Sequence, residues 1–325
     1  MGNALSQSFP PKSLFLVEQI PDLTGQVIIV TGGNAGVGKE TCKASRLALL
    51  NKNAKVYLAA RSKSRADDAI EWLKSETNGK APIFLELDLG NLASVRKAVE
   101  DFKSKEQELH VLFNNAGVMM PPVEQRTSDG YDLQFGTNVL GHYFFTVLLL
   151  PTLIHTAKNS PLANGHARVI NTSSSAVYFA PKTGIAWETL GTDASSISAS
   201  KKLGTNTLYA QSKLGNVLFS NELAKRYADQ GIISSSLNPV AVGNLQTDLQ
   251  RHLPWLVSKI LGLMFYPASY GALTQLWSGT TPDGESHNGK FLIPWARIGD
   301  AGPSSHDEKL AEKLWDWLEE HVKGH

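Results

Sequence analysis

A tyrosine and a lysine four residues apart have the types and the spacing needed for proton transfer. Tyr209 and Lys213 stand in the stretch LYAQSKLGN, and residues at i and i+4 share one face of a helix. Reducing a carbonyl with hydride requires a proton donor for the new alkoxide, and a phenol has a pKa of about 10, which is high for exchange at neutral pH. A neighbouring ammonium group stabilises the phenolate and lowers that pKa. Because this spacing is common by chance, the pair must be judged with its surroundings.

A cluster of hydroxyl side chains could orient the carbonyl for this proton transfer. Thr172, Ser173, Ser174 and Ser175 directly follow the apolar run RVIN at 168–171. In open parallel sheets, ligands bind beyond the carboxyl ends of the strands, and this cluster is expected there. The position by itself leaves open which of the three serines would be the reactive one.

A glycine-rich loop near the start of the chain could hold a pyrophosphate. In VIIVTGGNAGVGKE, the glycines Gly32, Gly36 and Gly38 lie between a predicted strand and a predicted helix. Glycine permits positive φ and has no side chain, so a phosphate can approach backbone N–H groups. The following helix would present its positive N-terminal end to that phosphate. The order strand, loop, helix is the context that such a motif requires. The alternative is a tight strand–helix turn without a ligand.

The residues that end the next predicted strands bear on which dinucleotide would bind. An NAD site usually has Asp or Glu at the end of the second strand, where it binds the ribose hydroxyls. Here KVYLAA (55–60) is followed by Arg61, which favours the additional phosphate of NADP, although NAD could also bind and Arg61 could simply be part of an exposed basic turn. Asp88 could accept a hydrogen bond from the adenine amino group. Further residues at the ends of the third and fourth strands are Leu89, Asn115, Ala116 and Gly117.

Short apolar runs that alternate with helical patterns must position these residues. Such alternation predicts βαβ units and a parallel sheet, and therefore an α/β fold. The predicted strands are 27–30, 55–60, 82–87, 111–116, 168–171 and 232–238, with 291–294 as a last strand. The helix-like segments include 39–50, 65–74, 92–105 and 209–227.

The two ends of the chain are expected to differ. Residues 1–24 are interrupted by prolines and predict an N-terminal arm, followed by one domain over 25–325. Residues 307–322 predict an amphipathic helix that docks on the core. The apolar face of this helix consists of Leu310, Leu314, Trp317, Leu318 and Val322.

Composition argues against several classes of partner. The chain has 325 residues, is 42% apolar and 19% charged, and carries a formal net charge of +1, as is ordinary for a globular protein. It has no block of Lys and Arg, so no nucleic-acid partner is expected. Nothing in the sequence suggests a metal site. The one cysteine, Cys42, excludes an internal disulfide and fits a cytoplasmic location.

Membrane association is expected to be weak at most. The longest apolar runs, Tyr143–Ile154 and Leu253–Phe265, are shorter than the ~20 residues that span a bilayer. The N-terminus lacks a basic stretch followed by an apolar one, so no signal peptide is expected. The start MGNALS matches the myristoylation pattern at Gly2. A single acyl chain would bind membranes only marginally.

The motifs TGGNAGVG, NNAG, NTSS and YAQSK occur in the order and context of the short-chain dehydrogenase/reductases. The chain resembles this family over roughly residues 24–300. IPDLTGQ, TNVLGHYFFT and SKLGNVLFSNELAKR are most similar to its retinol-dehydrogenase-like branch, and especially to fungal members. The resemblance implies a Rossmann-type, doubly wound parallel sheet and an NAD(P)-dependent oxidoreductase that interconverts a ketone or aldehyde and an alcohol. Reduction of an activated C=C bond is an alternative within the family.

The resemblance also implies roles for individual residues. Tyr209 would be the general acid/base, and Lys213 would lower its pKa and bind the nicotinamide ribose. Ser174 would orient the substrate carbonyl. Asn138 would support a proton relay through water, or else be a polar residue in helix packing, and we interpret His142 as structural. The implied cofactor-binding residues are Gly32, Asn34, Gly36, Val37 and Gly38 at the pyrophosphate, Asp88 at the adenine, Asn115 at the ribose, and Thr247.

Two segments would shape the substrate site. Tyr209 follows Ser174 by 35 residues, and we interpret the intervening chain as an inserted loop or flap over the pocket. Residues 245–270 resemble the family's substrate-covering region, and their apolar face suggests a small hydrophobic carbonyl or alcohol substrate. Alternatively, this segment packs on the body of the protein or meets a membrane surface. The helices that contain Phe144 and Tyr209 could form a homo-oligomer interface, as in many members of the family.

Two insertions depart from the family pattern. Val240–Val242 separate Pro239 from Gly243, in the loop that would flank the nicotinamide. The first helix is about four residues longer than usual in the family, with 44–47 as a candidate extra turn; four residues exceed one helical turn by only ~40°. Displacements of about 1 Å in an active site can cost ~100-fold in rate. The loop insertion therefore leaves open an alternative function, a catalytically impaired dinucleotide-binding scaffold or regulator.

Overall fold

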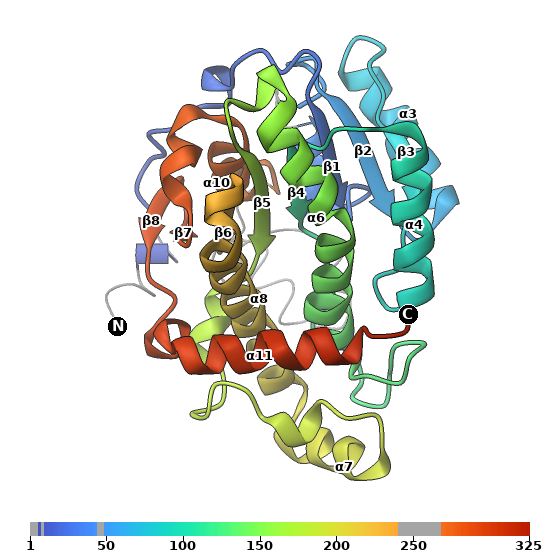
Figure 1. The fold of residues 1–325 in the computed structure, drawn as a ribbon, viewed down its shortest axis with the longest axis vertical. Coiled ribbons are helices and arrows are strands. Elements are labelled where there is room, and N and C mark those ends of the chain that lie inside the picture. The colour runs from blue at the N-terminus through green and yellow to red at the C-terminus, as the bar shows by residue number, and fades with distance from the viewer. Residues whose placement is uncertain (1–5, 8–9, 44–48, 240–267) are drawn as a thin grey trace, which may run out of the picture.

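An eight-stranded sheet forms the centre of the protein and lies between two layers of helices (Figure 1). The computed structural model describes residues 6–7, 10–43, 49–239 and 268–325. The strand order is β3-β2-β1-β4-β5-β6-β7-β8. Neighbouring strands are parallel except β8, which is antiparallel to β7. The strands are β1 (Val27–Thr31), β2 (Lys55–Ala60), β3 (Ile83–Glu86), β4 (Val111–Asn114), β5 (Ala167–Thr172), β6 (Ile232–Leu237), β7 (Phe291–Ile293) and β8 (Arg297–Gly299).

The order of the strands confirms the predicted Rossmann-type, doubly wound sheet. From β1 the chain builds outward through β2 and β3, and it then returns to place β4, β5 and β6 on the other side of β1. Strands β1, β4 and β6 are buried at every position because helices cover both faces. In β1 and β4 this burial accounts for the apolar runs VIIV and VLF, whereas β6 contains three buried serines. The short strand β8 was not predicted, because three residues are too few for a pattern.

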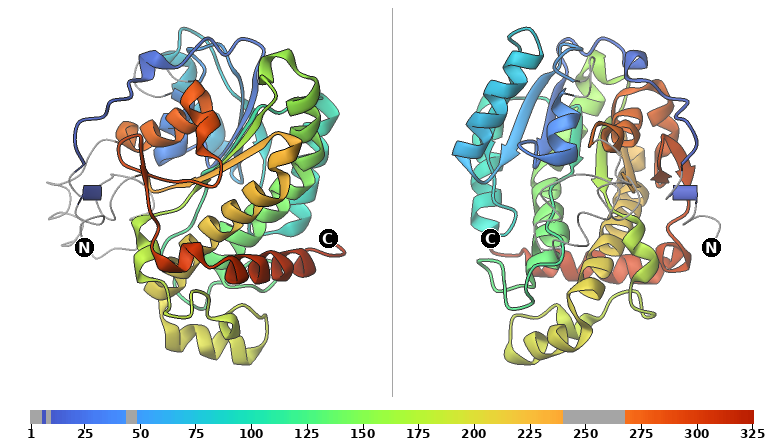
Figure 2. Two further views of the ribbon diagram at one scale, coloured as in Figure 1. Left: turned by 60° about the vertical axis from the view of Figure 1, so that its left-hand side comes forward. Right: turned by 180° about the vertical axis from the view of Figure 1, so that it is seen from behind.

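Helices cover both faces of the sheet, as Figure 2 shows from two sides. They enclose two apolar clusters. On one face, α4, α6, α8 and α11 pack over a cluster that contains Phe145 and Leu314. On the other face, α2, α3 and α10 pack over a cluster that contains Leu73 and Leu276. The helices are α2 (Gly36–Lys43), α3 (Lys63–Glu76), α4 (Leu92–Lys105), α5 (Leu133–Phe135), α6 (His142–Asn159), α7 (Ala194–Leu203), α8 (Thr205–Tyr227), α10 (Ala268–Thr280) and α11 (Glu308–His321).

Short polar side chains determine where three of these helices begin. Ser62, Asn91 and Asp307 precede α3, α4 and α11, and each side chain accepts a hydrogen bond from a backbone N–H group of the first turn. The predicted segment 92–105 is confirmed as α4. Helix α2 begins three residues before the predicted start at Lys39, and the candidate extra turn at 44–47 lies outside the described residues.

The longest helical run carries Asn138 and crosses the core. Residues Leu133–Asn159 comprise α5, a π-helix at Gly136–Gly141 and α6. This run is long and apolar enough to cross a membrane by length and composition, but 72% of its most apolar window is buried inside the protein. It packs against α4 and the sheet, so its apolar character is accounted for by the core.

The chain between Ser174 and Tyr209 folds into helical segments rather than an open loop. It contains short 3₁₀ helices at Ser175–Phe179 and Trp187–Thr189, followed by α7. The side chain of Gln211, on α8, accepts a hydrogen bond from the Ala186 N–H (3.1 Å) and donates one to Thr189 Oγ1 (2.9 Å), which fixes the insertion to α8. Helix α7 has the serine-rich sequence ASSISASKKL, which has no apolar stripe to predict it.

The C-terminal helix docks on the core as predicted. Figure 1 shows α11, in red, crossing α8. Leu314 and Leu318 are buried, and Trp315, which the predicted apolar face omitted, packs edge-on against Tyr143 of α6 and stacks on Phe219 of α8. The aromatic surface that we associated with a homo-oligomer interface is therefore partly covered within one chain, and the oligomeric state stays a prediction.

The described part of the N-terminal arm is built into the protein. Its apolar side chains Phe15, Ile20 and Leu23 are buried in the cluster beneath α10. Gln7 is fully buried, donates a hydrogen bond to the Tyr178 hydroxyl (2.8 Å) and accepts one from Asn238 Nδ2 (2.8 Å). The arm thus connects the end of β6 to the 3₁₀ helix that follows Ser174.

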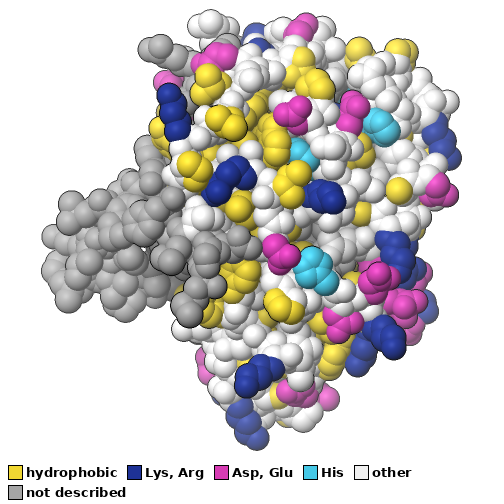
Figure 3. Space-filling model, turned by 90° about the vertical axis from the view of Figure 1, so that its left-hand side faces the viewer, with side chains coloured by type: hydrophobic (Ala, Val, Ile, Leu, Met, Phe, Trp, Pro, Cys, Tyr) yellow, Lys and Arg dark blue, Asp and Glu magenta, His cyan; other side chains and the backbone are white. Residues whose placement is uncertain are grey.

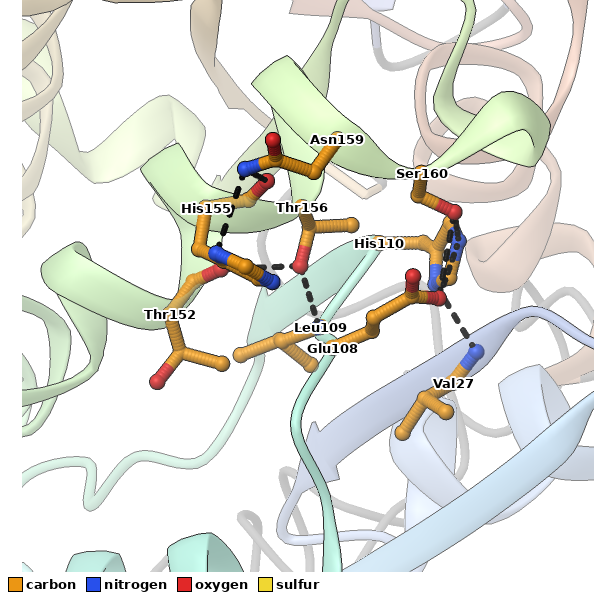
Figure 4. Close-up of polar contacts among 9 residues, drawn as sticks. All are labelled: Val27, Glu108, Leu109, His110, Thr152, His155, Thr156, Asn159 and Ser160. Atoms are coloured by element: carbon orange, nitrogen blue, oxygen red, sulfur yellow. Dashed lines mark hydrogen bonds and ion pairs between the residues drawn. The ribbon is translucent and has the colours of Figure 1, made fainter.

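A buried polar cluster lies at the amino-terminal edge of the sheet (Figure 4). His110 Nε2 is 3.0 Å from Ser160 Oγ, and the Ser160 hydroxyl donates to Glu108 Oε2 at 3.1 Å. The other ring nitrogen of His110 accepts a hydrogen bond from the Val27 N–H at 3.1 Å. Burial lowers the pKa of His110 below its usual value.

The surface over β8 and α10 has an even distribution of charge. On the face drawn in Figure 3, basic and acidic side chains are interspersed among apolar ones and neither sign of charge gathers in a block. Exposed apolar side chains of the protein include Phe179, which follows the Ser174 segment, and Ile298 of β8. This distribution agrees with the net charge of +1.

Candidate active site

The loops after β1 and β4 meet where the strand order reverses, and Thr31 joins them. Thr31 Oγ1 accepts hydrogen bonds from the N–H groups of Asn115 and Ala116, both at 2.9 Å. Asn115 Nδ2 donates to the Thr31 carbonyl at 2.9 Å. Sequence reasoning missed Thr31, because nothing in its type or spacing indicates that it links two loops. Ligands of doubly wound sheets bind in such a crevice.

The glycines of the first loop allow close packing at this switch point. Gly32 and Gly36 adopt left-handed φ values of 67° and 49°, which favour glycine. A Cβ atom on Gly32 would lie 3.0 Å from the Ala116 Cα, and one on Gly38 would lie 2.4 Å from Asn115 Nδ2. Helix α2 begins at Gly36, so its N-terminal end is at the carboxyl edge of β1. This cradle, which a Cβ would fill, fits the pyrophosphate of a dinucleotide.

The predicted adenine-side residues lie at the ends of β2 and β3. Arg61 follows β2 directly and its side chain is exposed. Asp88 is half-buried, and its Oδ1 accepts a hydrogen bond from the Gly90 N–H at 2.9 Å, which fixes the carboxylate. The Leu89 side chain is buried in the core, so only its backbone could contact a ligand. Asn34, in the first loop, and Val37, in the first turn of α2, are half-buried, and Val37 packs against Trp295.

Tyr209 and Ser174 come together at the carboxyl edge of β5. Tyr209 lies in the second turn of α8 and is 5% exposed, and its side chain is hydrogen-bonded to Ser174. Ser174 Oγ also accepts from the Ala176 N–H at 3.1 Å. The Ser173 hydroxyl points elsewhere and donates to the Lys213 carbonyl at 2.7 Å. Ser175 is buried. Of the three serines, Ser174 is the one beside the phenol.

Lys213 points from α8 toward the ends of β4 and β5. Its Nζ donates to the Thr172 carbonyl at 3.1 Å and lies 5.7 Å from the centre of the Tyr209 ring. A Cβ atom on Gly117 would come within 3.4 Å of this Nζ and 3.2 Å of Asn138 Oδ1. The small residue at 117 therefore leaves space beside the ammonium group, as the sequence suggested for a site where a ligand comes close.

Burial shifts the pKa values of both Tyr209 and Lys213. It raises the pKa of Tyr209 to about 12, while the hydrogen bond with Ser174 acts in the opposite direction. It lowers the pKa of Lys213 to about 8. The pKa of Tyr209 is therefore raised overall, because loss of solvent outweighs the hydrogen bond with Ser174, and the predicted lowering of the phenol pKa by Lys213 stays a prediction. At neutral pH the phenol is protonated, and the ammonium group is close to its titration range.

Asn138 lies in the π-helix and connects the loop after β4 to α8. Its Oδ1 accepts from the Val118 N–H (2.8 Å), and its Nδ2 donates to the Val118 carbonyl and to Ser212 Oγ, both at 3.0 Å. Its main-chain oxygen accepts from His142 Nδ1 at 3.0 Å, and the other ring nitrogen lies 2.9 Å from Thr31 Oγ1. Local π-helical turns are frequent at functional sites. Sequence reasoning missed Ser212, although it precedes Lys213.

Two methionines form an apolar surface beside the phenol. Met119 and Met120 are partly buried and pack against the cluster of Tyr209, Ala176 and Ala210. Met120 has a left-handed φ of 51°, a conformation that costs a residue other than glycine roughly 1–2 kcal/mol. Thr247, the Val240–Val242 insertion and most of the predicted substrate-covering segment lie outside the described residues.

The fold and the site together define a class of protein. A glycine cradle lies at the switch point of a Rossmann-type sheet, and a tyrosine, a serine and a lysine meet at the same edge. Such a sheet binds dinucleotides at this place, and the three side chains supply a proton donor, a hydrogen-bonding hydroxyl and a cation. The protein is an oxidoreductase that uses a nicotinamide dinucleotide.

Comparison with known proteins identifies the family. The family model for short chain dehydrogenase matches residues 26–187. A short-chain dehydrogenase/reductase of Armillaria gallica is 53% identical over 322 residues, which are 98% of each chain. Another, from Phomopsis amygdali, is 41% identical over 340 residues, covering 99% of this chain and 97% of the relative. The chain therefore belongs to the short-chain dehydrogenase/reductase family, and its similarity to fungal members is confirmed. The retinol-dehydrogenase-like branch stays a prediction.

Solved structures share the fold at low sequence identity. An active-site complex of Pseudomonas aeruginosa RhlG with NADP matches with a TM-score of 0.62 and 23% identity, covering 84% of this chain and 95% of that chain. A 3-ketoacyl-(acyl-carrier-protein) reductase from Brucella melitensis, complexed with NADH, matches with a TM-score of 0.60 and 20% identity, covering 83% and 96%. These likenesses show the common architecture.

Proposed function

We propose that the protein interconverts a ketone or aldehyde and an alcohol by hydride transfer, with NADP(H) as the preferred dinucleotide. The observation that carries this proposal is the buried Tyr209 side chain, which is hydrogen-bonded to Ser174, lies near Lys213 and packs among apolar groups. A carbonyl that receives hydride must also receive a proton on oxygen, and a positioned phenol is suited to donate it.

In the proposed reduction, the substrate oxygen accepts hydrogen bonds from the hydroxyls of Tyr209 and Ser174, which polarise the C=O bond. When bound, the dinucleotide supplies the hydride to the carbonyl carbon. The oxygen, which gains the electron pair of the C=O bond, then takes the proton of Tyr209. Burial keeps the pKa of Tyr209 at about 12, so the phenol holds its proton until the stronger base forms. Lys213 stabilises the phenolate that remains, and oxidation reverses these steps.

We propose that Asn138 acts mainly as a positioning residue. Its amide uses both oxygen and nitrogen to hold Val118 and also contacts Ser212, next to Lys213. Its main-chain oxygen accepts a hydrogen bond from His142 Nδ1. The predicted relay through Asn138 stays part of the proposal.

The preference for NADP rests on Arg61. This side chain follows β2, where NAD sites carry an acidic residue, and it is exposed to receive a phosphate. Two of the similar solved structures are complexes with NADP. One is that of RhlG, and the other is a short chain dehydrogenase from Burkholderia cenocepacia, which matches with a TM-score of 0.61 at 22% identity, covering 85% of this chain and 98% of that chain. The methionines beside Tyr209 favour an apolar substrate.

A cofactor-oxidation screen tests the proposal. Purified protein is supplied with NADPH or NADH and a series of apolar aldehydes and ketones, and loss of absorbance at the dihydronicotinamide band is followed. We expect turnover with NADPH. Replacing Arg61→Ser should raise the KM for NADPH about tenfold and leave that for NADH unchanged, because one charge-assisted contact is lost. Arg65→Ser, an exposed arginine on α3, is the matched control. Binding of either coenzyme without oxidation by any carbonyl would contradict the proposal.

A further inference from the structure

The loop after β4 is fastened along the helical run that begins at Leu133. Asn138 holds both backbone polar groups of Val118. One turn earlier, Gln134 Oε1 accepts a hydrogen bond from the Met120 N–H at 2.9 Å. The two amides are four residues apart and so lie on one face of the helix. They hold the loop at alternate residues, Val118 and Met120.

Gln134 is a buried side chain, and both of its polar atoms make hydrogen bonds that connect the loop after β4 to α8. We call these hydrogen bonds the latch. Gln134 is 1% exposed. Its Nε2 donates to the carbonyl and the hydroxyl of Thr205, at 3.0 and 3.3 Å, and Thr205 Oγ1 donates to the Pro121 carbonyl at 2.8 Å. Thr205 is the first residue of α8, one turn before Tyr209. The latch therefore ties the loop to the helix that carries the phenol.

The latch holds one residue in an unfavourable backbone conformation. Met120 has φ 51°, and left-handed backbone is strained for a methionine. Strain of this kind persists only where surrounding contacts determine the conformation, and it gathers at binding sites. The hydrogen bond from Gln134 is made to the N–H of the strained residue itself. Met119 and Met120, which we call the Met wall, pack against the cluster that contains Tyr209.

We infer that Gln134 is a specificity-determining positioning residue, which places the Met wall so that it receives the bulky apolar part of a carbonyl substrate. Methionine side chains are flexible and polarisable and adapt to irregular apolar groups. The site therefore takes carbonyl compounds with an extended, flexible apolar chain in preference to short ones. This inference rests on the proposed carbonyl reduction.

Gln134→Met tests the inference because it keeps the shape of the side chain but removes the latch. The readout is the KM for decanal divided by the KM for butanal, with NADPH in excess. We expect a wild-type ratio well below one and a rise of about tenfold or more in the variant, since displaced apolar contacts of a few methylenes have effects of this size. Gln211→Met is the matched control: it also removes buried hydrogen bonds from a glutamine, but those of the α7 insertion, and should leave the ratio unchanged.

Met120→Gly provides a second test that does not depend on tolerance of a change at Gln134. Glycine adopts positive φ without strain, which offsets part of the packing lost with the Met120 side chain, so this variant should fold. It lacks half of the Met wall, so the ratio should again rise. A wild type that reduces both aldehydes while both variants keep its ratio would overturn the inference and leave the proposed function standing. A wild type that reduces neither carbonyl would contradict the proposed function instead.

Discussion

The two edges of the sheet each hold a buried serine and a buried basic side chain, yet the hydrogen bonds run differently. At the amino-terminal edge, the Val27 N–H donates to His110 Nδ1, so the neutral ring carries its proton on Nε2 and donates to Ser160. The Ser160 hydroxyl in turn donates a hydrogen bond to Glu108 Oε2. A nucleophilic serine needs the opposite arrangement, in which the imidazole accepts the serine proton. The cluster in Figure 4 has the residue types of a triad, but its polarity makes it structural.

At the carboxyl edge, hydrogen-bonding capacity is left for a ligand. The Lys213 ammonium has three donors, and among the described residues it makes one hydrogen bond, to Thr172. Gly117 leaves space beside it. The difference between the edges teaches that residue types indicate a site only where their polar atoms are not all satisfied by one another. Loss of a residue should therefore harm activity at one edge and only stability at the other.

The largest contrast is expected between Tyr209→Phe and Ser160→Ala. Removing the phenol hydroxyl should lower kcat by at least about 100-fold, because a positioned proton donor contributes that much or more. Removing the Ser160 hydroxyl should leave kcat within a factor of two of wild type. Steady-state reduction of decanal with NADPH measures both, and a fluorescence titration checks that each variant still binds NADPH. Near-wild-type turnover by Tyr209→Phe would remove the tyrosine from the mechanism.

Lys213→Met should abolish turnover and at the same time stabilise the fold. Burial lowers the pKa of Lys213 to about 8 from 10.5, so the folded state disfavours the ammonium form. That shift corresponds to about 3 kcal/mol below pH 8, which the variant regains. The Thr172 carbonyl keeps a partner, because Asn216 Nδ2 also donates to it at 3.0 Å. Urea unfolding at pH 7 measures the gain, with the exposed Lys105→Met as the control. A large loss of stability in Lys213→Met would show that interactions of the ammonium group within the protein outweigh the cost of burying its charge.

Acid should destabilise both edges through their histidines. Burial lowers the pKa of His142 to about 4 and that of His110 also below 6.5. Between pH 6.5 and 4 these histidines are therefore protonated in the unfolded chain but largely neutral in the folded chain. The free energy of unfolding consequently decreases as the pH falls from 6.5 toward 4. For His142 the loss is about 3 kcal/mol. Urea unfolding across this pH range measures it, and His142→Gln should flatten part of the slope. A wild-type stability independent of pH in this range would contradict burial of the neutral rings.

The smallest effect is expected from Ser160→Ala on stability. The variant leaves Glu108, which is partly exposed, free to bind water, and it removes one acceptor from His110. We expect a loss of about 1 kcal/mol in the free energy of unfolding, the usual worth of a hydrogen bond. Thr192→Ala, at an exposed surface site, should lose less. A loss of several kcal/mol would mean that the cluster supports the amino-terminal edge as a unit.

The parts of the fold that could be predicted are those that one segment determines alone. Apolar runs such as VIIV are continuous because their strands are buried on both faces, and Asn91 marks the start of α4 by its capping chemistry. The insertion before Tyr209 was harder, because α7 is held by a cap at Asp193 and by neighbours rather than by an apolar stripe. Such support comes from elsewhere in the chain and is not visible in the segment itself.

The same distinction applies to the site. Tyr209 and Lys213 could be recognised together because four residues along a helix place them on one face. Their pKa values could not be anticipated, since burial decides them and depends on the whole fold. Thr31 and Gln134 were missed because each acts on a loop distant in sequence. A polar residue between two apolar ones, Leu133 and Phe135, is the signal that the sequence offers for Gln134.

The buried Gln7 has a consequence for how the protein is made. Its partner Asn238 is 231 positions later in the chain, and Tyr178 is 171 positions later. Gln7 therefore cannot take its place until β6 has also emerged from the ribosome. Packing around Tyr178, in the 3₁₀ helix that follows Ser174, is therefore completed late in synthesis.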